Sequence, residues 1–112
     1  MDNDKIRIAR NESLFRDVNE RIAETAERFE ASETGFVCEC ADKDCTERVA
    51  VALADYEEVR ADPTHFVLAH GHGLGAPVEV VVSSRPGYQI VEKIERVIRE
   101  HVERLDPRAE PA

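Results

Sequence analysis

Residues 36–52 read FVCECADKDCTERVAVA and contain all three cysteines of the chain. Residues 36–38 and 48–52 each have the short, apolar, β-branched pattern of a strand. The polar residues 41–44 between them are typical of a turn. We therefore expect a β-hairpin that carries the cysteines in and next to its turn.

The three cysteines predict a metal site. Residues i and i+2 of a strand lie on the same face, so Cys38 and Cys40 would present both sulfur atoms on one side. The turn can bring Cys45 back to them, and so short a loop costs little entropy to close. A tetrahedral zinc ion would then need one more donor. We favour zinc over copper or iron because three thiolates and an imidazole suit it, and an iron–sulfur cluster is less compatible with only three cysteines.

The fourth ligand is expected in AHGHG, residues 69–73. His72 is the first choice because it follows a predicted strand and lies between two glycines, which permit a tight backbone turn. His70 is the alternative fourth ligand, and His65 or a carboxylate such as Asp42 is a further possibility. Two interpretations without a structural metal stay open: reduced, inert cysteines, or a redox-sensing thiol cluster.

The composition limits the partners and the compartment. The chain has 112 residues, with 24 acidic and 15 basic side chains and a net charge of −9. This charge repels phosphate groups, so we expect no nucleic-acid partner and no binding to an anionic membrane. An odd number of cysteines argues against a disulfide framework. We see neither a signal peptide nor an apolar run long enough for a membrane helix, and we expect a cytoplasmic protein.

The N-terminal part of the chain predicts an amphipathic helix. Residues 1–10 are polar and are expected to form a flexible arm. The helix would begin near Asn11 or Ser13, which can both cap its free amide groups. Its apolar residues recur at helical spacing and would form one stripe, made of Phe15, Val18, Ile22, Ala26 and Phe29. This stripe would pack on the protein's own core or, alternatively, form a seam with the helix of a second copy.

The remaining elements complete one small domain over residues 11–105, followed by a tail at 106–112. Apolar periodicity and turn residues predict, in order, a helix at 53–60, a strand at 65–69, strands at 78–83 and 87–91, and a helix at 92–105. This order predicts an α+β fold, with antiparallel hairpins and N-terminal, middle and C-terminal helices. A core with few aromatic residues would benefit from a metal cross-link.

No catalytic residue is predicted. The glycines of residues 71–75 are spaced G-x-G-x-G and lack the lysine of a phosphate-binding loop. The sequence also lacks the patterns of zinc deaminases, zinc proteases and serine hydrolases. Glu39 could act as a base on a metal-bound water, but four protein ligands would leave no position for that water.

Several segments together resemble a group of small uncharacterised bacterial proteins, found mainly in actinobacteria. The segments are residues 11–21 (NESLFRDVNER), 36–40 (FVCEC), Cys45, 56–60 (YEEVR), 65–67 (HFV) and 71–72 (GH). The group shares an N-E-x-L-F-R-x-V-N-E-R helix, a C-E-C-x4-C segment and a G-H turn. The resemblance matches Gly71-His72 to the G-H turn of the group, which favours His72 over His70 as the fourth ligand. His70 is a departure, since it stands where the group is expected to have proline. It implies no activity.

The sequence therefore predicts a zinc-stabilised intracellular module that binds or regulates, engaging a protein partner or a second copy of itself as a homodimer. The alternative is a thiol and zinc redox sensor that releases its metal on oxidation. A small zinc-dependent hydrolase is the third and weakest interpretation.

Overall fold

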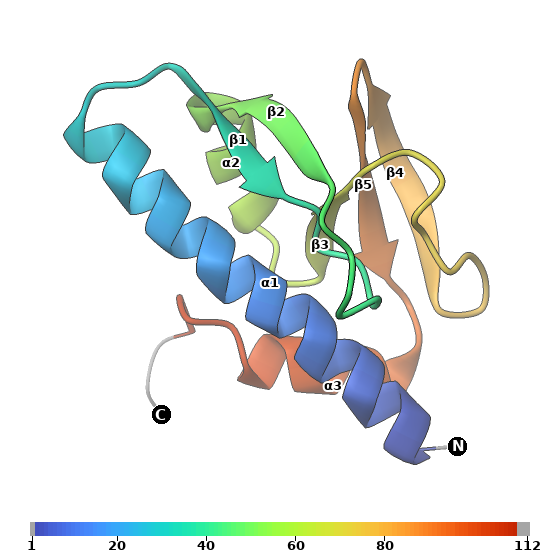
Figure 1. Cartoon of the computed structure of the whole chain (residues 1–112). Helices are drawn as coiled ribbons and strands as arrows, with labels where there is room; N and C mark the ends of the chain where they lie inside the picture. Colours follow the sequence, from blue (N-terminus) through green and yellow to red (C-terminus); the bar gives the residue numbers. More distant parts are fainter. Residues whose placement is uncertain (1, 110–112) are drawn as a thin grey trace.

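The structure is a computed structural model that describes residues 2–109, and it shows three helices and five strands (Figure 1). In chain order they are α1 (Asp2–Arg28), β1 (Glu33–Val37), β2 (Arg48–Ala52), α2 (Leu53–Arg60), β3 (His65–Leu68), β4 (Glu79–Arg85), β5 (Tyr88–Lys93) and α3 (Arg96–Arg104). In Figure 1, α1 crosses the molecule diagonally beside β1 and passes over α3. None of the described helices is long and apolar enough to cross a bilayer.

The strands form two antiparallel sheets. β1 pairs with β2 in the predicted hairpin, with Phe36 opposite Val49. The second sheet has the order β3-β5-β4, so β5 is central and β4 is an edge strand. The α+β prediction is confirmed.

The core consists of two apolar clusters. The first centres on Phe36, whose ring stacks on Tyr56 at 4.3 Å between centroids. The second includes Cys38 and Cys40 together with Phe66. Because two of the cysteines belong to this second cluster, the candidate metal ligands are attached to the packed interior rather than to a loose surface loop.

The predicted flexible arm at residues 1–10 is wrong for the residues that the structure describes. α1 begins at Asp2 instead of Asn11 or Ser13; Met1 lies outside the described residues. The helix continues to the N-terminal side because Ala9 is fully buried in the second core cluster, which also includes residues of α3. Lys5 adds an ion pair with Glu95, at 3.1 Å between Nζ and Oε1.

The predicted apolar stripe of α1 does not pack into the core as a whole. Ala26 is buried, but Val18 is 40% exposed and Phe29 is 77% exposed. The buried face is mostly polar and contains Glu12, Ser13, Arg16 and Asn19. The helix faces the core with these polar side chains because Glu12, Arg16 and Asn19 have partners inside the fold.

Arg16 illustrates why this polar face can be buried. Its guanidinium group donates to the carbonyl oxygens of Pro63 and Val102, at 2.6 and 2.7 Å. The same group lies 4.4 Å from the centre of the Phe66 ring, a cation–π distance. A buried guanidinium needs such partners because an unpaired buried charge is strongly destabilising.

The predicted tail at 106–112 also contacts the domain in the part that is described. Asp106 forms an ion pair with Arg60 of α2. Arg108 contacts Glu20 of α1 and Glu57 of α2, the latter at 2.6 Å. Residues 106–108 therefore extend the packed domain beyond the predicted boundary at 105, and residues 110–112 lie outside the described part.

Candidate metal centre

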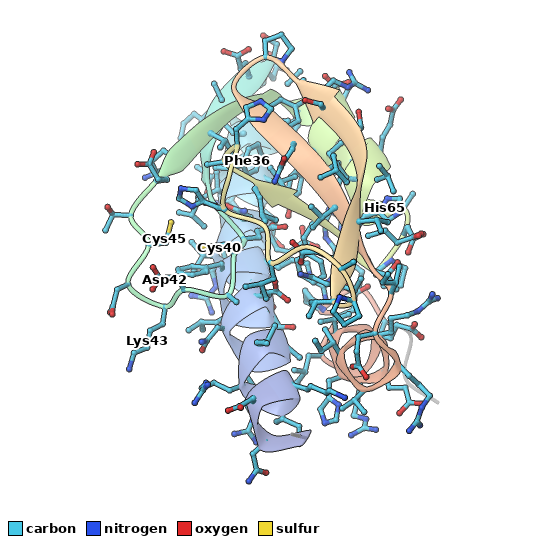
Figure 2. The ribbon with its side chains drawn as sticks, turned by 90° about the vertical axis from the view of Figure 1, so that its right-hand side faces the viewer. Phe36, Cys40, Asp42, Lys43, Cys45 and His65 are labelled. Atoms are coloured by element: carbon cyan, nitrogen blue, oxygen red, sulfur yellow. The ribbon has the colours of Figure 1, made fainter. Side chains whose placement is uncertain are left out.

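Four side chains converge beside the hairpin turn. The sulfur atoms of Cys38, Cys40 and Cys45 and one ring nitrogen of His72 all lie within 4.8 Å of one another. All three cysteines are free thiols, so no disulfide competes for them. Figure 2 shows Cys40 and Cys45 on the loop between β1 and β2, with Lys43 at its outer end.

The hairpin places the cysteines through backbone hydrogen bonds. Cys38 follows directly after β1 and continues the ladder by donating its N–H to the Glu47 carbonyl at 3.0 Å. Beyond it the loop turns back at Asp42, whose carbonyl accepts the Cys45 N–H at 3.0 Å. The Asp42 carboxylate accepts the Asp44 N–H at 3.0 Å. Asp42 is thus a turn residue, and it is not part of the ligand cluster.

Glu39 lies between Cys38 and Cys40 in the sequence, but its side chain contacts Val67 and Asn19. Its side chain is fully buried, and Oε1 accepts the Val67 N–H at 3.0 Å. Its other oxygen accepts the amide N–H of Asn19 at 2.8 Å. Burial raises the pKa of this carboxyl group, although these hydrogen bonds oppose the shift. Both oxygens are engaged in the core, so Glu39 is not placed to act as a base on a metal-bound water.

His72 completes the cluster through Nδ1. This atom lies 3.6 Å from Cys38 Sγ and 3.5 Å from Cys45 Sγ. In a tetrahedral zinc site, bonds of about 2.3 Å to sulfur and about 2.0 Å to nitrogen place the two ligand atoms about 3.5 Å apart. The two observed separations match this value, so the position of His72 relative to Cys38 and Cys45 fits a zinc ion.

A glycine turn explains why His72 is the histidine that reaches the cysteines. The His72 N–H donates to the Ala69 carbonyl at 3.2 Å, and Gly71 has a φ of 81°. This left-handed conformation is readily available only to glycine. His70 is exposed on the other side of the turn, where its Nε2 lies 2.7 Å from the Arg85 carbonyl.

The structure therefore brings together the three cysteines and His72, and it does not bring the predicted alternatives to them. His70 and Asp42 have the other contacts described above. His65, the remaining alternative, is on β3 and lies well away from Cys45 in Figure 2. The identity of the fourth donor depends on the Ala69–His72 turn, which selects one of two neighbouring imidazoles.

The two buried thiols of this cluster, Cys38 and Cys40, are poor acids without a cation. Burial raises the pKa of Cys38, and a hydrogen bond from the Ala69 N–H, at 3.2 Å from the sulfur, only partly offsets the shift. Burial also raises the pKa of Cys40. A bound cation would stabilise the thiolates, so metal binding here would release protons and strengthen as pH rises.

Two asparagines of α1 hold the loop, and the sequence reasoning missed both. Asn11 donates its side-chain amide to the Ala41 carbonyl at 2.9 Å. Asn19 pairs with both backbone groups of Val37, accepting its N–H and donating to its carbonyl at 2.8 Å each. Asparagine is an unfavourable residue inside a helix, and this was the available signal that these two positions serve tertiary contacts.

Comparison with protein-family models, with curated proteins and with solved structures finds no significant match to this chain. The resemblance to the actinobacterial group stays a prediction. The function must therefore be argued from the site.

Proposed function

We propose that this chain is a zinc-stabilised binding or regulatory module, in which one ion joins the hairpin loop to the turn after β3. The main support is the ligand geometry, with His72 Nδ1 at 3.5 and 3.6 Å from two sulfur atoms. The ligand segments belong to separate parts of the chain, residues 38–45 and residue 72. Metal binding energy at such a site contributes directly to folding energy.

The donor set favours a structural metal over a catalytic one. Three cysteines and one histidine fill the tetrahedral coordination of zinc and leave no position for water or substrate. Cys38 and Cys40 are only 1% and 2% exposed, which further limits access to the ion. The proposed ion therefore maintains the shape of the domain, and binding would take place elsewhere on its surface.

The binding surface that we propose is the exposed apolar face of α1, with a second copy of this chain as its occupant. Leu14 and Phe29 are 60% and 77% exposed on this face. They line a groove of about 700 Å³ that also contains one acid and one base, Asp17 and Arg21. Exposed apolar patches of this kind mark interaction sites. The groove is locally neutral in a chain of net charge −9, so two copies can approach through it with little repulsion.

Elemental analysis of the purified protein tests the metal part of the proposal. We expect one zinc per chain in the parent and in the His70→Ala variant, and a loss of zinc in His72→Ala. Cobalt substitution adds a spectroscopic test, because thiolate-bound Co²⁺ has intense charge-transfer absorption. A parent that binds no zinc or cobalt, or a His72→Ala variant that binds them as the parent does, would rule out this site.

Light scattering after size-exclusion chromatography tests the proposed self-association. We expect the parent to dimerise as concentration rises, and Phe29→Glu to remain monomeric with its zinc retained. Glu24→Gln, at an exposed position of the same helix, serves as the control. A parent that stays monomeric at high concentration would contradict the second copy as occupant and leave a different protein as the partner to be sought.

The redox-sensor alternative has one observation in its favour. Cys45 is more exposed than the other two cysteines, so an oxidant can reach one ligand of the cluster without unfolding the core. Zinc release titrated with peroxide separates the two functions. Fast, complete and reversible release without unfolding would favour the sensor, whereas slow, partial release accompanied by unfolding favours a purely structural ion.

A further inference from the structure

A second group of potential metal ligands lies on β3, β5 and the turn after α2. His65 Nε2 is 3.4 Å from Asp62 Oδ2 and 3.3 Å from Glu92 Oε1. One ligand atom from each of the three side chains lies within 4.8 Å of the other two. This group is separate from the cysteine cluster, and Figure 2 shows His65 on the opposite side of the domain from Cys45.

Backbone structure holds the three side chains in place. His65 and Glu92 are directly opposite each other in the antiparallel pairing of β3 with β5. Asp62 is oriented by its other oxygen, because Oδ1 accepts the backbone N–H of Thr64 at 2.9 Å and its hydroxyl at 2.7 Å. This arrangement leaves Oδ2 directed at the imidazole. Carboxylate ligands of metal sites are commonly oriented by hydrogen bonds of this kind.

The group has more acceptors than the imidazole can satisfy. Two carboxylates approach the same ring nitrogen, Nε2, which carries at most one proton and can donate one strong hydrogen bond at a time. A bound dication would satisfy both carboxylates together.

The surroundings leave room for further ligands. The side chains of His65, Glu92 and Asp62 are 24%, 34% and 44% exposed, so water can complete a coordination shell. His65 also lines a cleft of about 280 Å³, whose other walls include Arg85 and Tyr88. A metal at this position would have open coordination sites, unlike one held by three cysteines and a histidine.

We propose that Asp62, His65 and Glu92 form a second, open site for a divalent cation of the oxygen- and nitrogen-preferring class, such as Mn²⁺. Two carboxylates and one imidazole select this class over the soft cations that thiolates prefer. The site is independent of the proposed structural zinc, because it shares no ligand with it.

Titration of the full chain with Mn²⁺, followed by the electron paramagnetic resonance signal of the free ion, tests this proposal. Mn²⁺ prefers oxygen ligands to thiolates, so the result does not depend on whether the cysteine cluster holds zinc. We expect one bound Mn²⁺ per chain. His65→Ala and Glu92→Gln should each weaken its binding about ten-fold or more, and His70→Ala and Glu24→Gln should leave it unchanged.

Asp62→Asn provides a second, milder variant. An asparagine side chain keeps an oxygen that can accept the Thr64 hydrogen bonds but removes the negative charge, so the turn is retained while Mn²⁺ binding weakens. Circular dichroism verifies that each variant is folded. Absence of Mn²⁺ binding to the parent, or equal binding by His65→Ala and His70→Ala, would overturn the second site without affecting the proposed zinc centre.

Discussion

Replacement of Glu12 by glutamine should change the pH dependence of stability more than stability itself. Glu12 of α1 is fully buried and contacts Lys93 of β5, and Glu79 of β4 contacts the same ammonium group. Two carboxylates thus share one cation inside the core. Burial raises the pKa of Glu12 from 4.5 to about 7, and the attraction of Lys93 reduces the shift without cancelling it.

The expected magnitude follows from this shift. Between about pH 4.5 and about pH 7 the unfolded chain loses the Glu12 proton while the folded chain keeps it. The folded state is therefore favoured below this window and loses that advantage as pH rises through it. One pKa unit corresponds to about 1.4 kcal/mol, so the full loss is about 3 kcal/mol. Between about pH 5 and about pH 8 we expect the free energy of unfolding to fall by roughly 2–3 kcal/mol of this total.

Urea unfolding of the parent and of Glu12→Gln at several pH values measures this effect. Glutamine stays neutral, so the stability of the variant relative to the parent should rise by about 2–3 kcal/mol from about pH 5 to about pH 8. Saturating metal is kept in both samples, since the proposed zinc site also responds to pH. Glu24→Gln, at an exposed position, should show no such trend. If the difference in free energy of unfolding between the parent and Glu12→Gln stays constant with pH, Lys93 keeps Glu12 ionised in the folded state, and the reasoning is refuted.

Three further predictions concern the loop and the C-terminal segment. Cys40→Ser should lose the metal and several kcal/mol of stability; a variant that melts where the parent does would show that the metal has no structural role. Asn19→Ala should cost about 3–5 kcal/mol in urea unfolding, because it leaves both backbone groups of the half-buried Val37 and one oxygen of the fully buried Glu39 unpaired. A loss below about 1 kcal/mol would contradict the role of Asn19 in holding the loop. Arg108→Ala should cost only about 1 kcal/mol at low salt, and less at high salt, as partly exposed ion pairs do.

The sequence alone determined several of the local elements, although the helix predicted at 92–105 begins only at Arg96, because residues 92–93 belong to β5. The helix predicted at 53–60 is α2, and the strand predicted at 48–52 is β2. These predictions succeed because apolar periodicity, turn residues and proline act over a few neighbouring residues. The cysteine cluster could be predicted from the sequence for the same reason, because three thiols within one short loop can meet without help from the rest of the chain.

Only the tertiary structure decided which face of α1 is buried and which histidine joins the cysteines. The apolar pattern of Val18 and Phe29 predicted the wrong face, because the burial of Asn19 and Arg16 depends on Val37 and Val102, far away in the sequence. Likewise, the sequence favoured His72, which lies between two glycines, but left His70 open as the alternative. A positive φ at Gly71 and the position of the hairpin loop direct His72 to the sulfur atoms. Partners that are distant along the chain leave no periodic signal, so these choices are made only when the elements pack.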